Sequence, residues 1–308
     1  FRLNPAIVIS FTPKAGFLNS LTFFSPGISI HYFTGQRWAT LTGLFRSYLM
    51  FVDFFIGTLM RCTYCDSLSQ AKYISSQIPI VPPRVVAMGS IKGVNHSRWN
   101  SRDHLSLHTV SSAFPQLIPV LEAHSRPKTV FGFVGRLCRD KGIFNLLEAY
   151  EVHRLRHPSS VLILVGPIED PSLSSVIVSC SSSVIHIDYT DKIELILPLF
   201  TALVLPSYRE GFGSVVLEAA ACRVPSIVTN IPGPVDFVED SINGLIVQPG
   251  SVSDLVRSLD YIALNPVPTE LMGRNAYQKS LLSYKEDFVL ESFLDELSSR
   301  FLHDTAKQ

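Results

Sequence analysis

The chain has 308 residues, and its 26 Lys and Arg residues balance its 26 Asp and Glu residues, so its formal net charge is zero. Apolar residues make up 46% and charged residues 17% of the sequence, which excludes an intrinsically disordered chain. The balance of charge also excludes a strongly basic protein that binds nucleic acid mainly through its phosphates. The length predicts about two domains.

The first half of the chain contains two short strand-like runs, at residues 6–10 and 28–32. Residues 48–60 are the most hydrophobic segment and have helical spacing, and a second helix is expected at 67–76. The helix at 48–60 is too short to span a membrane, which takes about 20 residues. Because it is apolar nearly all round, it is either buried or in contact with lipid, and we favour burial. The polar stretch 95–107 is expected to be a loop or linker.

Five cysteines are present, and Cys62 and Cys65 form the sole C-x-x-C pair. One such pair supplies two ligands, whereas a structural zinc site needs four, and no matching pair lies nearby. Reduced thiols are therefore favoured over a redox or metal-binding role. No signal peptide is visible. The chain begins with Phe1 and enters a strand almost at once, so we expect a fragment that lacks its natural N-terminus.

The second half of the chain alternates short apolar strands with helices. Strands are expected at 129–134, 161–165, 184–188, 202–205, 226–229 and 245–247, with helices at 143–154 and 192–200, after Gly213, and over 251–308. Such alternation implies a parallel sheet that helices cover on both faces. Ligands of such a doubly wound domain bind beyond the carboxyl ends of the strands. No strand is followed by G-x-G-x-x-G, so a dehydrogenase is set aside.

The sharpest pattern is a turn between a buried strand and a helix, Ser207-Tyr-Arg-Glu-Gly-Phe-Gly-Ser-Val-Val-Leu-Glu218. Gly211 and Gly213 permit a tight turn and a close approach of the backbone to a ligand. The free backbone N–H groups of Ser214 and Val215, together with the helix dipole, favour an anion. The turn is therefore a candidate anion-binding site.

Two carboxylates flank this turn. Glu218 lies in an apolar helix, where a carboxylate without a partner is costly. Glu210 and Glu218 could instead be solvated surface charges, but that cost favours a binding role. Glu218 is placed to accept hydrogen bonds from two vicinal hydroxyls, as on a ribose.

Two cations follow the first strand of the second half, in Gly135-Arg136 and, five residues later, in Asp140-Lys141-Gly142. Both fall on the ligand edge of the predicted sheet. Arg136 offers a planar fork for phosphate oxygens, and Lys141 a mobile point charge. The two could be solvated loop charges, but beside the turn at 207–218 they favour a diphosphate leaving group, whose growing charge they would stabilise without a metal.

Taken together, these patterns resemble the C-terminal domain of family 4 retaining glycosyltransferases of the GT-B fold. The resemblance covers about residues 128–250 and includes G-R-x-x-x-D-K-G, E-G-F-G-x-x-x-x-E and Asn243–Pro249, whereas Arg223 stands where the family often has Gly. It implies that Arg136 and Lys141 hold the donor diphosphate, that Glu210 lies by the donor sugar and that Glu218 binds the ribose. The implied donor site comprises Gly135, Arg136, Lys141, Ile187, Asp188, Glu210, Gly211, Phe212, Gly213, Ser214, Val215 and Glu218. Within it, Ile187 and Asp188 would lie at the edge of the pocket for the nucleobase.

The first half resembles the bacterial branch of this family that builds capsule, O-antigen and exopolysaccharide, through Ser10–Gly16 and His31–Trp38. The family places a histidine facing the donor sugar, which implies this role for His31; a core or capping histidine is the alternative. Thr12, Lys14 and Gly16 are candidate acceptor residues. Family members have a further strand, glycine-rich loop and helix before the point where this chain begins.

The resemblance implies an α/β chain of GT-B fold, with two Rossmann-like doubly wound domains facing across a cleft and the first one incomplete. Residues 1–118 would form the acceptor domain and 119–275 the nucleotide-sugar domain. Residues 276–308 would form helices that pack back toward the N-terminal domain. The groups expected to carry the chemistry are His31, Arg136, Lys141 and Glu210.

The implied function is transfer of a hexose or an N-acetylhexosamine, with retention of configuration, from a nucleotide sugar. UDP is the expected nucleotide, and a polyprenyl-diphosphate-linked saccharide the expected acceptor, in cell-surface polysaccharide biosynthesis. No metal and no other cofactor is expected, and no nucleic acid partner. The expected location is the cytoplasm, with peripheral contact at the inner face of the plasma membrane. The alternatives are a sugar-nucleotide 2-epimerase of similar fold and an inactive nucleotide-binding fragment.

Overall fold

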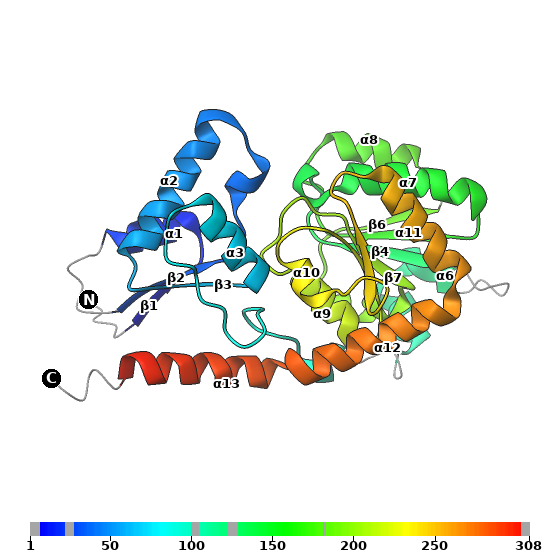
Figure 1. Ribbon diagram of the computed structural model, residues 1–308. Helices are drawn as coiled ribbons and strands as arrows, with labels where there is room; N and C mark the ends of the chain where they lie inside the picture. The colour runs from blue at the N-terminus through cyan, green and yellow to red at the C-terminus, as the bar shows by residue number, and fades with distance from the viewer. Residues whose placement is uncertain (1–6, 22–27, 100–104, 122–128, 181–182, 303–308) are drawn as a thin grey trace.

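The computed structural model describes residues 7–21, 28–99, 105–121, 129–180 and 183–302 of the chain. Within them, two parallel β-sheets lie in separate lobes, side by side (Figure 1). The strand order is β1-β2-β3 in the first sheet and β6-β5-β4-β7-β8-β9 in the second. This arrangement confirms the expected α/β architecture.

The second sheet contains every strand predicted for the second half of the chain. Its strands are β4 (Val130–Val134), β5 (Val161–Val165), β6 (Val184–Ile187), β7 (Ala202–Leu205), β8 (Ser226–Thr229) and β9 (Gly244–Val247). Its helices are α7 (Ile143–Arg156), α8 (Ser172–Ser179), α9 (Ser214–Ala221), α10 (Pro234–Phe237), α11 (Val252–Leu264) and α12 (Pro266–Ser283). Since β5, β7 and β8 are buried at every residue, an unbroken apolar run was the right signal for a covered sheet.

Two local predictions, one in each half of the chain, were wrong. The helix expected at 192–200 is a pair of 3-10 turns, η4 (Ile193–Leu195) and η5 (Leu197–Leu199). Pro198 lies in the second turn, and proline lacks the N–H that an α-helix interior requires. The predicted loop at 95–107 contains a helical turn, α4 (His96–Trp99). The rest of that prediction falls partly on residues 100–104, which lie outside the described residues.

The first lobe consists of β1 (Ile7–Ser10), α1 (Pro13–Ser20), β2 (Ile28–Phe33), η1 (Arg37–Thr40), α2 (Gly43–Leu59), β3 (Cys62–Cys65) and α3 (Leu68–Gln77). The C-x-x-C residues span β3, and both thiols are free. No described helix is both long enough and apolar enough to cross a lipid bilayer.

Burial of α2, the interpretation favoured from sequence, is wrong for one side of the helix. Asp53 and Ile56 are buried, but Leu44, Phe45, Tyr48 and Phe51 are exposed. The described part of the first sheet is narrow, and α2 packs mainly against α1 and η1. Its neighbours therefore cover one face and leave a row of large apolar side chains in contact with solvent.

Among the described residues, two segments pack against the lobe formed by the other half of the chain. The segment 94–117 was predicted in the first domain, but Val94, Trp99 and Val110 belong to the hydrophobic core of the second sheet. This segment includes α5 (Leu107–Ala113) and η2 (Pro115–Leu117), and α6 (Ile118–Leu121) follows. In the opposite direction, α13 (Glu286–Leu297) and the turn η6 (Ser298–Leu302) run beneath the first sheet (Figure 1). There the ring of Phe293 meets Tyr64 edge-on, with the ring centroids 5.7 Å apart.

The loops at the carboxyl ends of both sheets face each other. Ser69, just after β3, donates its backbone N–H to Asp236 Oδ2 at 3.0 Å, and its Oγ accepts from Gly233 N at 2.9 Å. A Cβ on Gly211 would collide with the carbonyl oxygen of Thr34, which follows β2. The two lobes thus meet across the edge at which doubly wound sheets bind ligands.

Candidate active site

A cation and a carboxylate that are both largely shielded from solvent form the centre of this edge. Lys141 ends the 3-10 turn η3 (Arg139–Lys141) after β4, and Glu210 lies between β7 and α9. Because β4 and β7 are neighbours in the sheet, their following loops run side by side. Lys141 Nζ lies 2.6 Å from Glu210 Oε1, and Ser207 Oγ donates to the same oxygen at 2.7 Å. The side chains of Lys141 and Glu210 are 19% and 10% exposed, so the pair is strongly shielded from solvent.

A small pocket of about 160 Å³ opens directly beside this pair. It lies between the lobes, since Thr34 and Gly35 of the first lobe line it together with Arg136, Lys141 and Glu210 of the second. Arg136 is half exposed and forms an ion pair with Glu169, with NH1 and Oε2 2.7 Å apart. Arg209 lines it as well, so the pocket offers three cations to a ligand that lies between the two lobes.

Helix α9 begins three residues after Gly211, which lines this pocket. Gly213 caps this helix in the left-handed conformation, with φ of +83°, which only glycine adopts without strain. Ser214 and Val215 are the first helical residues, so their N–H groups have no partner within the helix. Glu218 follows one turn later, and burial raises its pKa, against the lowering effect of Lys92, whose Nζ lies 3.6 Å from Glu218 Oε1.

Other predicted donor residues occupy the same edge of the second sheet. Gly135 directly follows β4, where its N–H donates to the carbonyl of Val165 at 2.9 Å. Ile187 is the buried last residue of β6, and Asp188, next to it, is exposed. Phe212 is buried and packs against Tyr284, with the ring centroids 5.4 Å apart. The structure thus gathers all the predicted donor residues at the carboxyl ends of β4, β6 and β7 or in α9.

His31 lies elsewhere. It was expected near the end of its strand, but β2 runs on to Phe33, and Thr34 and Gly35 occupy the strand end instead. The His31 ring is buried, its Nδ1 lies 3.0 Å from Ser10 Oγ, and its pKa is lowered to about 4 by burial. Its described contacts lie within the first lobe, so the structure does not bring His31 together with Lys141 and Glu210.

Of the three candidate acceptor residues, two line a common pocket and one does not. Thr12 caps α1 by accepting a hydrogen bond from Ala15 N at 3.2 Å, and Lys14 is exposed. Both line a pocket on the first lobe. Gly16 is buried directly against the ring of His31 and does not line that pocket.

Sequence analysis gave no role to three charged residues of the cleft, Asp66, Lys92 and Arg209. Asp66 directly follows β3 and is buried against Gly211, and its Oδ1 has no hydrogen-bond partner among the described residues. Burial, and secondarily the charge of Glu210, raises the pKa of Asp66 to about 7. Its place after a strand was a usable signal. Lys92 carried no such signal, because it reaches Glu218 from a different lobe.

Comparison with known proteins agrees with this geometry. Residues 120–279 match the family described as Glycosyl transferases group 1. The capsular polysaccharide biosynthesis glycosyltransferase CapM of Staphylococcus aureus is 25% identical over 98% of this chain and 78% of its own length. The N,N'-diacetylbacillosaminyl-diphospho-undecaprenol alpha-1,3-N-acetylgalactosaminyltransferase of Campylobacter jejuni is 26% identical over 54% of this chain and 44% of its own length.

Among solved structures, HepE from Anabaena in complex with UDP-glucose is similar, with a TM-score of 0.80 and 17% identity. The similarity covers 96% of this chain and 79% of HepE. The family match spans more than half of the chain and includes the whole second sheet. The chain therefore belongs to the group 1 glycosyl transferases and is a glycosyltransferase of the GT-B fold.

Proposed function

We propose that this enzyme transfers a hexose or an N-acetylhexosamine from a UDP-sugar, with retention of configuration, to a saccharide carried on a polyprenyl diphosphate. The observation that carries the proposal is the interdomain pocket in which Lys141 and Glu210 lie 2.6 Å apart beside Arg136. The UDP-glucose complex of HepE supports the donor class. The diphospho-undecaprenol acceptor named for the C. jejuni relative supports the acceptor class.

The charges of the pocket suit a departing diphosphate. Arg136 would exchange Glu169 for phosphate oxygens, and Lys141 would add a second cation, so the growing charge is compensated where it forms. The N–H groups that begin α9 are available to a further phosphate oxygen. Glu218, behind them, would accept hydrogen bonds from the ribose hydroxyls. No metal and no other cofactor is part of the proposal.

Retention follows from attack on the same face of the sugar. The acceptor hydroxyl oxygen bonds to the anomeric carbon as the bond from that carbon to the diphosphate breaks. The proton of the hydroxyl passes to the departing phosphate oxygen, so atoms and charge balance without a protein base. The protein's contribution is charge stabilisation and orientation of the two substrates.

Calorimetric titration with UDP tests the donor site. We expect micromolar binding to the unchanged chain, and a loss of about tenfold or more in Arg136→Ala and Glu218→Ala, since hydrogen bonds to charged groups contribute about 1.5–3 kcal/mol. Arg274→Ala, which removes an exposed ion pair on α12, is the matched control and should bind normally. Unchanged binding in both cleft variants would contradict the assignment. Turnover of UDP-sugars, with the product anomer read by NMR, distinguishes an active enzyme from a nucleotide-binding fragment.

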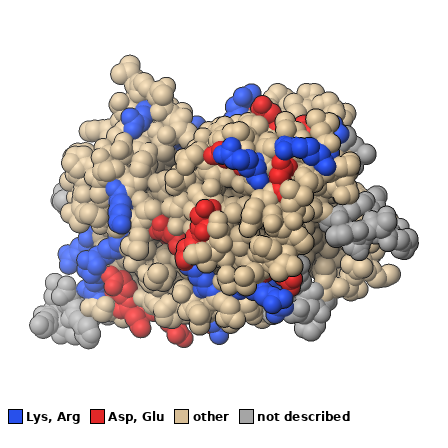
Figure 2. Space-filling view, turned by 45° about the vertical axis from the view of Figure 1, so that its right-hand side comes forward, with Lys and Arg blue, Asp and Glu red and all other residues tan. Residues whose placement is uncertain are grey.

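The surface of the first lobe supports a membrane-borne acceptor. Among residues 7–99, the two acidic residues, Asp53 and Asp66, are both buried, whereas most of the cations are exposed. Leu44 and Phe51 on α2 are 91% and 60% exposed. The upper left part of Figure 2, where α2 projects, shows tan and blue surface and no red. We extend the proposal to peripheral contact of this apolar, cationic surface with the anionic inner face of the plasma membrane.

Vesicle co-sedimentation tests this contact. We expect the protein to bind vesicles of phosphatidylglycerol and phosphatidylcholine, to bind pure phosphatidylcholine less, and to lose most of its binding in Phe51→Ser, because an inserted aromatic ring contributes apolar burial. Leu282→Ser, on α12 of the second lobe, removes a similarly exposed apolar side chain and should have no effect. Equal losses in the two variants would count against a specific lipid-facing surface.

A further inference from the structure

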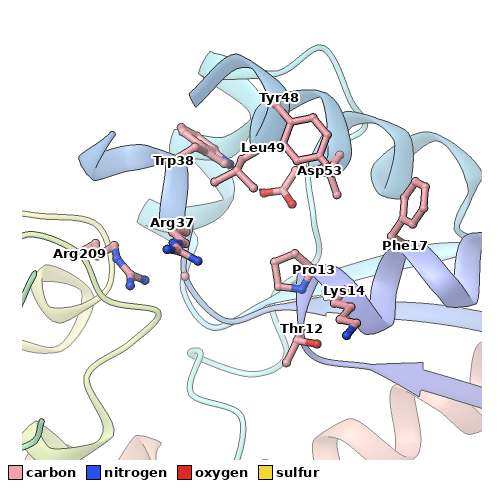
Figure 3. A pocket seen from close by; sticks show the side chains of 12 residues that line it. Thr12, Pro13, Lys14, Phe17, Arg37, Trp38, Tyr48, Leu49, Asp53 and Arg209 are labelled. Carbon is pink, nitrogen blue, oxygen red and sulfur yellow. The ribbon is translucent and has the colours of Figure 1, made fainter. Parts of the chain in front are cut away.

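A second pocket, of about 500 Å³, lies on the first lobe between α1, η1 and α2 (Figure 3). One residue of the second lobe, Arg209, closes its side. The pocket combines aromatic rings with cations, and the side chains that matter here are Phe17, Trp38, Tyr48, Lys14, Arg37 and Arg209. Flat apolar faces beside polar groups are the surroundings that suit a sugar ring bearing an anionic substituent.

Asp53 supplies a carboxylate to this pocket. It is 4% exposed and lies on α2, and Figure 3 shows its oxygens directed into the pocket near Trp38 and Leu49. Trp38 Nε1 donates to Asp53 Oδ2 at 2.8 Å. No cation of the described residues pairs with this carboxylate, and burial raises its pKa to about 6. A carboxylate has about four acceptor positions, so a single indole N–H leaves capacity for further donors.

The pocket adjoins the donor cleft. Gly35 and Arg209 line both this pocket and the small interdomain pocket beside Lys141 and Glu210. A molecule seated against Asp53 would therefore lie next to the sugar that is transferred. At its outer side the pocket reaches Tyr48, one of the exposed apolar residues of α2. An acceptor could thus extend from the donor cleft toward a lipid surface.

We propose that this pocket binds the sugar of the acceptor and that Asp53, by accepting hydrogen bonds from its hydroxyl groups, determines which sugar is used. The inference rests on the proposed function, because it concerns the acceptor of that reaction. Trp38 is the positioning residue, since its N–H fixes the carboxylate and its ring adds a flat face. Lys14 and Arg37 lie where they can meet the diphosphate that links the sugar to its lipid.

The test uses the fluorescence of Trp38. The chain has two tryptophans, Trp38 and Trp99, so Trp99→Phe leaves Trp38 as the sole reporter. The probes are decyl diphosphate-linked glucose, galactose, N-acetylglucosamine and N-acetylgalactosamine, each titrated into UDP-saturated enzyme. We expect a saturable change with at least one probe, and binding weakened by about tenfold or more in Asp53→Asn, the range for hydrogen bonds to a charged group. UDP affinity should be unchanged, because Asp53 does not line the donor pocket.

Further variants separate recognition from structure. Asp53→Asn keeps the shape of the side chain and an oxygen for the Trp38 N–H. Tyr48→Ala alters a pocket wall at an exposed position and should also weaken binding of the probe, whereas Phe288→Ala, which removes a similarly exposed aromatic ring on α13 outside the pocket, should not. Saturable binding that Asp53→Asn and Tyr48→Ala leave intact would overturn the inference, as would the lack of any fluorescence change with all four probes. If the unchanged chain did not bind UDP, that result would instead contradict the proposed function.

Discussion

Replacing Lys141 by alanine is expected to lower kcat by about 10²–10³, the range seen when one group that stabilises developing negative charge is removed. Lys141 is held 2.6 Å from Glu210 in a largely buried position, so its charge is screened little by solvent. The substitution also removes the positive charge beside Glu210, which keeps the hydrogen bond that it accepts from Ser207 Oγ. Initial rates at saturating donor and acceptor measure the effect, with UDP affinity measured in parallel.

The chain contains a matched control for this variant. Lys279 lies 2.6 Å from Glu239 and is 23% exposed, so its ion pair resembles that of Lys141 in length and in the burial of the lysine. It lies on α12, outside the cleft. Lys279→Ala should therefore change stability by about 1 kcal/mol or less, the usual range for partly exposed pairs, and leave kcat unaltered. Comparable losses of kcat in both variants would show that ion-pair removal, and not position, causes the effect.

The second sheet could be predicted from sequence because its signals are local. Each strand is a short apolar run, and Gly213, at the start of α9, marks a turn with positive φ. At Arg223, by contrast, the residue type does not signal the backbone conformation. It stands where the resembling family often has Gly, and its φ is +61°, a conformation that costs a residue with a side chain about 1–2 kcal/mol. The sequence departs there from the family, but the backbone keeps the conformation that glycine favours.

The rest of the site depends on contacts that no local pattern encodes. Lys92 reaches Glu218 across more than a hundred residues of chain, and Asp53 acquires its role from a tryptophan on a separate turn. The strand end expected just before His31 lies a few residues later, since β2 continues to Phe33 and carries the histidine into the body of the lobe. For α2, periodicity identified the helix but could not tell how much of it the small first lobe would cover.

Asp66→Asn is expected to stabilise the protein in a pH-dependent way. Burial, with the charge of Glu210, raises the pKa of Asp66 from its ordinary 3.8 to about 7. Between these values the folded protein keeps a proton that the unfolded chain has lost, so stability declines as the pH rises through this interval. Above about pH 7 the full cost of the buried charge is present. Asparagine cannot ionise, so the variant escapes this cost.

The size of the effect follows from the same shift. From pH 5 to pH 8, the stability advantage of Asp66→Asn over the unchanged chain should grow by about 2–3 kcal/mol, since each pKa unit corresponds to about 1.4 kcal/mol. Denaturant unfolding at the two pH values measures it, and other titrating groups cancel in the difference. Asp287→Asn, at a side chain that is 76% exposed, should show no such growth. An advantage that stays constant with pH would contradict the shifted pKa. A positive result would mean that the protein retains a destabilising carboxylate where its two lobes close on Gly211, which is the pattern expected of a residue kept for function rather than for stability.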